Sequence, residues 1–527
     1  MILSKNPLSV IASFLLIVLI GFLGIFTYKY GWQWLDSDYA AEMVLGKLLA
    51  DENAFLSPNW YYGNEIHIIF QTLFTMPLFK LLGHLENWAL IRSICIMLNH
   101  IVLVFSYIFM MRQMRVGIRW ILITALFLLM PLPVEYWKIV TYSGSYIFFI
   151  AQVFFCLGFF SLLIDRIAEK KPVLIPFILF SALSFMHGVQ GIRALMALYI
   201  PLLMVCLYLW VRSKQKKLLP LLLGSYGFIL CCMGFFANHL LHNKYSFFSF
   251  DTMRAEYLSN YWQKLGQILM NIFGYFAPIG GSRFLSAHVF FGMIALVGTI
   301  VMLFAVIKTV NRARFEREPQ LIPVFFAASA LFNIFLFIII YQGIVVRFFI
   351  PFMVFYVPLI AIFFEYAKTY TPIKRKVLVS LIVVVVIGYG SFNFSYIAAS
   401  ENNSNRKGYI QYLLDNQLDF GFATYWNANI TIELSNGKVE AATLDPKIKG
   451  GSAKRPLQIA KHLSPSRYSD PLYYQGESFL LFSRIEWESV KSRMRSYGKQ
   501  SPDYEDGDFI IVRLPSAQFI HSEFLEN

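Results

Sequence analysis

The sequence predicts a mainly α-helical membrane protein: a polytopic bundle of about eleven transmembrane helices followed by a small α/β domain. Of the 527 residues, 57% are hydrophobic and only 14% are charged, a composition typical of a chain surrounded mostly by lipid. Apolar runs recur up to residue 396, after which the composition becomes that of a soluble domain. We therefore divide the chain into a transmembrane domain, 1–396, and an extracytoplasmic α/β domain, 397–527.

The apolar runs approach the length of roughly 20 residues that spans a hydrocarbon core as a helix. The first run lacks a small-residue cleavage site, so we expect it to be retained as the first helix. The stretch 253–276 carries charges before its apolar part, and we expect an interfacial or re-entrant element there. The expected crossings are 8–28, 88–111, 120–130, 145–164, 172–186, 194–211, 218–240, 288–307, 321–341, 348–366 and 377–396.

Lys and Arg gather in alternate loops, which the positive-inside rule assigns to the cytoplasm. The amino terminus is then cytoplasmic and 397–527 lies outside. The formal net charge of +14 comes from these inner loops, which face anionic lipid headgroups, so it requires no nucleic-acid partner. The clusters lie at 112–119, 166–171, 212–217, 308–317 and 368–376.

The first outer loop, 31–87, is long and rich in acids and aromatics. We expect a helix capped by Ser37 or Asp38, with Asp38 and Glu42 one turn apart on the same face. The piece 65–82 is apolar but is interrupted by polar residues and a proline, which predicts a helix lying in the membrane interface.

The last part of the chain shows the alternation of strand and helix patterns of a small α/β domain. We expect helices at 407–416, 427–435 and 486–495 and strands at 420–426, 438–444, 478–482 and 509–514. All five cysteines lie inside apolar runs, which indicates neither a disulfide framework nor a thiolate metal site.

Asp36-Ser37-Asp38, at the outer edge of the first apolar run, is the leading candidate for chemistry. Such a pair can deprotonate an attacking hydroxyl, hold a divalent cation, or cap a helix and bind water. We favour Asp36 as a general base, with Asp38 as its partner, and the purely capping role stays open. Two carboxylates supply fewer oxygens than a hard cation prefers, so we assign no metal site, while a divalent cation stays open as a cofactor.

Basic side chains predicted near the same face can stabilise a phosphate leaving group as it gathers negative charge. For each of them, snorkelling to lipid headgroups is the alternative. These candidates are Arg347, Arg193, Lys138, Arg283 and, in the first outer loop, Lys80.

Four further residues are candidates for substrate binding. Tyr61 and Tyr142 suit stacking on a sugar, although an interfacial aromatic belt explains them equally well. His187 is either a second base or phosphate donor, or a structural histidine. Glu42 adds a third carboxylate to the acid pair.

With these features the chain resembles the GT-C superfamily of membrane glycosyltransferases, which includes protein O-mannosyltransferases and the bacterial aminoarabinose transferase. The resemblance rests on Asp36-Ser37-Asp38 in a long outer loop, the interfacial helix near Pro77, Arg347-Phe348-Phe349-Ile350-Pro351, and Tyr425-Trp426-Asn427-Ala428-Asn429 in the outer domain.

This resemblance implies an inverting transfer of a sugar from a polyprenyl-phosphate carrier to a glycan, lipid or protein acceptor of the cell envelope, at a bacterial plasma membrane. Asp36 or Asp38 would be the base, and Arg347, with Lys138 or Arg193, would hold the lipid phosphate. Because the chain has no Gly-rich phosphate loop and its acids face outward, a soluble nucleotide donor is not favoured.

A transporter or a lipid-linked glycan flippase is the main alternative. Such proteins are expected to show inverted repeats and ionisable groups near the bilayer midplane. Here we find no internal repeat, and the charges collect at the outer rim, with His100 as the main exception. A noncatalytic assembly protein, whose outer domain binds a partner, is a third reading.

Overall fold

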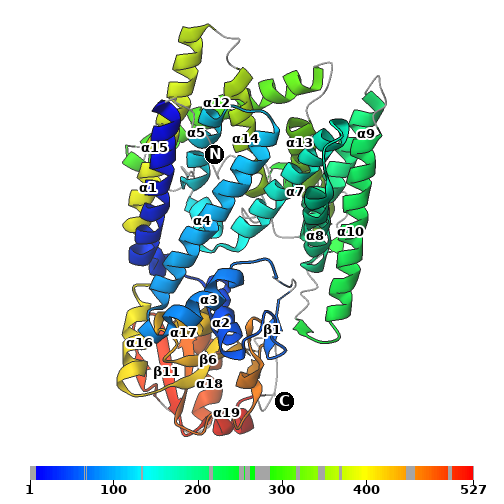
Figure 1. Cartoon of the computed structure of the whole chain (residues 1–527). Helices are drawn as coiled ribbons and strands as arrows, with labels where there is room; N and C mark the ends of the chain where they lie inside the picture. The colour runs from blue at the N-terminus through cyan, green and yellow to red at the C-terminus, as the bar shows by residue number, and fades with distance from the viewer. Residues whose placement is uncertain are drawn as a thin grey trace. The chain divides into compact units, whose positions relative to one another are not determined.

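The computed structural model describes residues 7–63, 66, 68–131, 134–212, 218–247, 254–255, 262–266, 285–315, 321–341, 350–366, 371–446, 457–496 and 501–525. The chain divides into two compact units, coloured along the sequence in Figure 1. Unit 1 comprises Met1–Leu23, Ile96–His239 and Phe250–Ala399, and unit 2 comprises Gly24–Cys95, Leu240–Ser249 and Ser400–Asn527. Unit 2 thus unites the predicted first outer loop with the carboxy-terminal segment.

Unit 1 is built from helices, and α1, α4 and α10 contribute residues to both units. Within unit 1, α12 packs against α14 and α15, α14 against α5, α7 against α8, and α13 against α9. The short strands β3 (Arg254–Ala255) and β4 (Ile340–Tyr341) pair antiparallel. The helices are α1 (Pro7–Tyr30), α4 (Trp88–Gln113), α5 (Ile118–Leu129), α6 (Val134–Tyr136), the π-helical η3 (Trp137–Tyr142), α7 (Ser145–Ala168), α8 (Leu174–Val189), the π-helical η4 (Leu195–Tyr199), α9 (Ile200–Arg212), α10 (Leu219–Leu241), α12 (Ala287–Phe315), α13 (Leu321–Ile339), α14 (Ile350–Tyr366) and α15 (Pro372–Ala398).

Among the described residues, six helices are long and apolar enough to cross a membrane, and the number rises to seven if one bent pair forms a single span. That pair, Ile118–Leu129 with Val134–Tyr142, is bent by 91°. Leu174–Val189 and Leu321–Leu336 are shorter apolar helices. The chain is a multi-pass membrane protein, while the predicted total of about eleven crossings is not confirmed. The predicted orientation stays a prediction.

Unit 2 contains a six-stranded mixed sheet in the order β10-β11-β9-β5-β6-β7. The central strand β5 runs parallel to both β6 and β9, whereas β11 and β7 run antiparallel to their neighbours. All but the two edge strands β10 and β7 lie at or near ranges predicted from the sequence. The strands are β5 (Phe420–Thr424), β6 (Glu440–Pro446), β7 (Leu457–Ile459), β9 (Ser478–Ser483), β10 (Tyr504–Glu505) and β11 (Phe509–Leu514).

Three helices flank this sheet at the expected places: α16 (Arg406–Asp415), α17 (Tyr425–Leu434) and α18 (Arg484–Ser496). A fourth helix, α19 (Ala517–Glu523), follows β11. Strand β5 ends at Thr424 rather than at the predicted residue 426, because α17 begins at Tyr425. Helix α17 packs on β5 and β6, as Figure 1 shows.

Two helices from the predicted first outer loop also belong to unit 2. Helix α2 (Ser37–Glu52) packs against both α17 and α3 (Thr72–Leu82). The interfacial helix predicted from residue 65 is shorter than expected, since α3 begins only at Thr72, while residues 64, 65 and 67 lie outside the described residues. A Cβ at Gly46 would lie 2.5 Å from Thr75 Oγ1, so glycine permits the close approach of α2 to α3.

A small second sheet joins distant parts of unit 2. Strand β1 (Trp60–Tyr62) pairs parallel with β2 (Ser246–Phe247) and antiparallel with β8 (Ser464–Pro465). The segment that follows α2 is therefore held by the same carboxy-terminal part of the chain that forms the larger sheet.

Candidate active site

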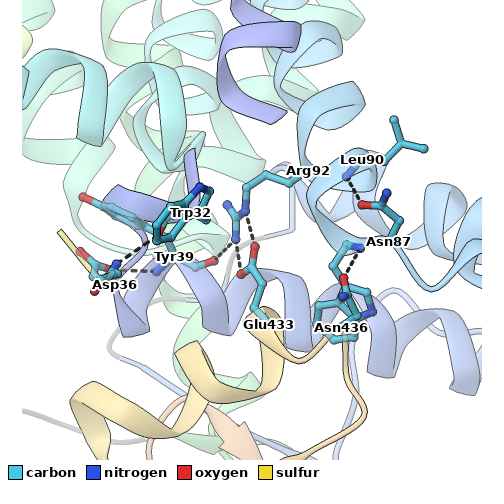
Figure 2. Close-up of polar contacts among 10 residues, drawn as sticks. Trp32, Asp36, Tyr39, Asn87, Leu90, Arg92, Glu433 and Asn436 are labelled. Carbon is cyan, nitrogen blue, oxygen red and sulfur yellow. Dashed lines mark hydrogen bonds and ion pairs between the residues drawn. The ribbon is translucent and has the colours of Figure 1, made fainter. Parts of the chain in front are cut away.

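Asp36 lies at the amino-terminal end of α2, and Leu35 separates it from the 3₁₀ helix η1 (Gly31–Trp34). Its backbone is extended and its Oδ1 accepts a hydrogen bond from Tyr39 N at 3.1 Å, so Asp36 is the cap of the helix (Figure 2). The predicted cap, Ser37 or Asp38, is wrong, because both residues are already helical. A half-buried carboxylate in this position is also stabilised by the positive end of the helix dipole.

Asp38 and Ser37 both contact Tyr425, the first residue of α17. The Tyr425 hydroxyl donates to Asp38 Oδ1, and the Ser37 hydroxyl donates to the Tyr425 carbonyl. Burial raises the pKa of Tyr425, and the negative charges of Asp38, Asp36 and Glu42 raise it further. The phenol therefore keeps its proton at neutral pH and acts as a donor.

Three carboxylates from α2 and its cap lie near this phenol. Glu42, with only 8% of its surface exposed, follows Asp38 by one helical turn on the same face, as predicted. Because Asp36, Asp38 and Glu42 all act on the pKa of Tyr425, each lies within electrostatic range of the phenol. Within the described part of the chain, no group of three or more His, Cys, Asp or Glu side chains could hold a metal ion.

Two aromatic side chains of the carboxy-terminal segment surround Tyr425. The His462 ring lies 5.2 Å from the Tyr425 ring, and the exposed Trp426 ring meets it edge-on at 5.1 Å. Burial lowers the pKa of His462, and the charge of Asp38 partly opposes this shift. His462 is therefore mainly neutral at neutral pH and can accept or donate a proton.

A buried ion pair lies two turns beyond Tyr425 along α17. Arg92 of α4 binds Glu433 of α17 through two hydrogen bonds of 2.6 Å, and its Nη2 also donates to the Tyr39 carbonyl at 2.9 Å (Figure 2). Sequence reasoning missed this pair. The available signal was an arginine near the start of an apolar run, because a buried charge requires a partner.

The backbone that precedes Asp36 is also held by the carboxy-terminal segment. Asn403 Nδ2 donates to the carbonyls of Leu35 at 2.8 Å and Trp32 at 3.1 Å. Arg406 links this asparagine to α17, since its Nε donates to Asn403 Oδ1 and its Nη1 to Asn427 Oδ1. Asp36 therefore follows a stretch of backbone whose carbonyl groups are held by hydrogen bonds from Asn403.

The carboxy-terminal end of α17 is fixed to α4. Gly437, with a φ of 76°, closes the helix by donating its N–H to the Ile432 carbonyl. Asn436 Oδ1 accepts from Trp88 N at 2.9 Å (Figure 2). Helix α17 is therefore anchored at both ends.

The remaining candidates for substrate and phosphate binding are divided between the units. Tyr61 lies in β1 of unit 2, with its hydroxyl 3.4 Å from Ser469 Oγ. In unit 1, Lys138 forms an ion pair of 3.1 Å with Glu135. Lys138 and Tyr142 both belong to η3, where the buried Tyr142 ring is stacked with that of Trp137.

Arg193 and His187 lie near each other in sequence and have separate surroundings in unit 1. The Arg193 guanidinium lies over the Tyr146 ring at 4.9 Å. His187 is buried, and its Nδ1 lies 2.9 Å from the Tyr199 hydroxyl. Arg347 and Arg283 lie outside the described residues, so their predicted role stays a prediction.

No protein-family model matches the chain, and no curated protein sequence matches it. A solved structure does: the crystal structure of ArnT from Cupriavidus metallidurans bound to undecaprenyl phosphate, with a TM-score of 0.55 and 11% sequence identity. The match covers 94% of this chain and 97% of the ArnT chain. The chain therefore has the fold of ArnT, and the resemblance to GT-C membrane glycosyltransferases expected from its sequence is confirmed at the level of the fold.

Proposed function

We propose that the protein is a membrane glycosyltransferase that transfers a sugar from a polyprenyl-phosphate-linked donor to an acceptor of the cell envelope outside the cytoplasm. The observation that carries the proposal is the acid cluster on α2, in which Asp36 caps the helix and Asp38 accepts from Tyr425. The fold supports the same class, since the ArnT structure was solved with undecaprenyl phosphate bound.

The chemistry is a displacement at the anomeric carbon of the donor sugar. A carboxylate takes the proton from the acceptor hydroxyl or amine as that atom attacks the sugar. The bond between the sugar and the phosphate oxygen breaks, and its electron pair leaves with the polyprenyl phosphate. Attack opposite the leaving group inverts the configuration of the sugar.

We assign the proton acceptor to Asp36, the acid at the cap of α2, whose Oδ1 accepts from Tyr39 N, while Asp38 accepts from the Tyr425 phenol. Asp38 and Glu42 are then supporting carboxylates, and Tyr61 is a candidate for contact with a sugar. None of these assignments requires a metal, and a divalent cation stays open as a cofactor.

The departing phosphate needs cations to stabilise its growing charge. We propose Lys138, Arg193, Arg347 and Arg283 for this role, with Tyr142 and His187 as neighbours of the substrate. Lys138 lies in a π-helical segment and Arg193 lies two residues before another, and such segments often occur at functional sites. The orientation with residues 397–527 outside the cytoplasm belongs to the same proposal.

The test compares cell-envelope glycans and lipids by mass spectrometry in bacteria with and without the protein. We expect a sugar modification that disappears without the protein and returns with the wild-type chain. Asp36→Asn and Asp38→Asn should each reduce the modification by at least about 100-fold. The first change removes the proposed proton acceptor, and the second removes the carboxylate that supports it.

Asp51→Asn is the matched control. Asp51 is an exposed acid of the same helix and pairs with the exposed Lys47 at 2.5 Å, so this variant should restore the modification fully. Full restoration by the Asp36→Asn/Asp38→Asn double variant would refute the catalytic assignment. Flux of a lipid-linked glycan without any new glycosidic bond would favour a flippase instead.

A further inference from the structure

We infer that Tyr425 is a positioning residue, which sets the geometry of the carboxylates on α2 by donating its phenol to Asp38. The inference rests on the proposed function, because it concerns the same carboxylates. It makes the carboxy-terminal segment a working part of the active site rather than an accessory binding module.

The first argument comes from the contacts at the start of α17. Tyr425 receives the Ser37 hydroxyl on its carbonyl and gives its own hydroxyl to Asp38. One residue is thus attached to two consecutive residues of α2, through its main chain and its side chain. Two attachments fix both the distance and the rotation of the first turn of α2 relative to α17.

The second argument is electrostatic. Asp36, Asp38 and Glu42 carry like charges near one another, and repulsion tends to rotate such side chains apart or to protonate one of them. A phenol that keeps its proton is a neutral donor, so it can hold a carboxylate without cancelling its charge. Since the pKa of Tyr425 is raised, the phenol does not compete as a base at neutral pH.

The third argument is that other contacts hold the same turn of α2 rigidly. The Tyr39 peptide donates its N–H to Asp36, while its carbonyl accepts from Arg92, which is bound to Glu433 of α17. The two anchors, Tyr425 and Glu433, lie two turns apart on one helix. Side chains held in this way can place a base within the narrow range of positions that proton transfer requires.

The test uses membranes isolated from bacteria that carry the variant as their only copy, with their own lipid-linked donors and acceptors as substrates. The readout is the initial rate of the modification, at equal protein levels and across pH 5 to 9. Tyr425→Phe removes the hydroxyl but keeps the ring that packs on Trp426 and His462. We expect a rate reduced by about 10-fold to 100-fold.

The acidic limb of the rate profile should also move to higher pH, because the ionised acid cluster loses a donor that stabilises its charge. The charged and titratable groups near this position are Asp36, Asp38, Glu42 and His462. A purely structural role for Tyr425 would lower the amount of folded protein without moving this limb.

Tyr409→Phe is the matched control. It also removes a buried phenol that contacts α17, through Thr431 at 3.0 Å, but this phenol contacts no carboxylate of α2 in the described structure. We expect the wild-type rate and pH profile. If Tyr425→Phe fails to fold, Ser37→Ala carries the test, because it removes the other attachment, and we expect a rate several-fold below that of the wild type.

The outcomes separate the two proposals. If Asp36→Asn and Asp38→Asn abolish the modification while Tyr425→Phe or, where needed, Ser37→Ala keeps the wild-type rate and acidic limb, the positioning role is overturned and the proposed function stands. If the two aspartate variants are fully active, the proposed function fails, and the positioning role fails with it.

Discussion

Arg92 and Glu433 are buried charges, with side chains only 4% and 6% exposed. Removing both ions from water costs several kcal/mol each, and their mutual attraction offsets this cost only when the geometry is good. Here the contact is bidentate, and Arg92 donates a further hydrogen bond to the Tyr39 carbonyl. The main effect of the pair is therefore to hold α4, α17 and α2 in one arrangement, and its net contribution to the free energy of unfolding is small.

Glu433→Gln should destabilise unit 2 strongly, because it removes the carboxylate opposite a buried guanidinium. We expect a loss of about 3–5 kcal/mol in the free energy of unfolding, measured by denaturant unfolding of the purified protein. Glu86→Gln is the control, since Glu86 and Lys438 form an ion pair whose side chains are 64% and 55% exposed. Its loss should cost less than about 1 kcal/mol. Equal losses in the two variants would contradict this account.

The acids of the candidate site are conspicuous in the sequence, but the residues that hold them are not. Asp36 and Asp38 stand out because two carboxylates follow a long apolar run. Arg92 and Glu433 are 341 positions apart, and neither has a local pattern that names the other. Tyr425 was noticed only as part of a short motif, because its contact with Asp38 depends on how α17 packs against α2.

Helices α2 and α3 approach closely at Gly46, where a Cβ would lie 2.8 Å from the Thr75 Cβ and 2.5 Å from its Oγ1. Both threonine atoms are close to the backbone and have little freedom to move. The distance between the two helices is therefore limited by this contact, and with it the position of the helix that carries the acids.

Gly46→Ala should push α2 away from α3. We expect a loss of about 1–3 kcal/mol in stability and a reduced modification rate, measured by thermal unfolding and in the membrane assay. Gly83→Ala is the control, because Gly83 ends α3 in a helical conformation with nothing within 4 Å of the added carbon. A stable, fully active Gly46→Ala variant would show that the helices can separate without consequence.

The regular elements of the carboxy-terminal segment were more predictable than those near the acids. Strand β11 occupies the predicted residues 509–514, because a short run of aromatic and β-branched residues, Phe509 to Val512, defines a buried strand locally. The cap of α2 was predicted one or two residues too late, since aspartate and serine are both good caps and only the backbone decides between them. The predicted start of α3 also failed, because an apolar composition does not say where a helix begins.

The helices of unit 1 place the chain in a membrane, and the number of crossings depends on short or bent helices. Hydropathy recognises the long helices, such as Trp88–Gln113 and Tyr146–Ala168. Hydropathy does not decide whether Leu174–Val189, or the bent pair Ile118–Leu129 and Val134–Tyr142, crosses the membrane. Neighbouring helices can satisfy the backbone of a short or broken helix within a bilayer.

Labelling with a membrane-impermeant maleimide tests the proposed orientation. Ser522→Cys, at an exposed position in α19, should react in intact cells, because residues 397–527 are proposed to lie outside the cytoplasm. Glu169→Cys, exposed at the end of α7, should react only after permeabilisation. The native cysteines, of which four are buried and one is half-buried, provide the background measurement. The reverse pattern would invert the topology.

The hydrogen bond between Ser37 and Tyr425 joins residues that are 388 positions apart. During synthesis, the ribosome therefore completes almost every membrane helix before the partner of the first acidic helix emerges. Contacts between such distant parts of a chain form late and slowly. A nascent chain that stops before Tyr425 would already contain the described membrane helices but would lack this contact, so on our proposal it could not yet transfer a sugar.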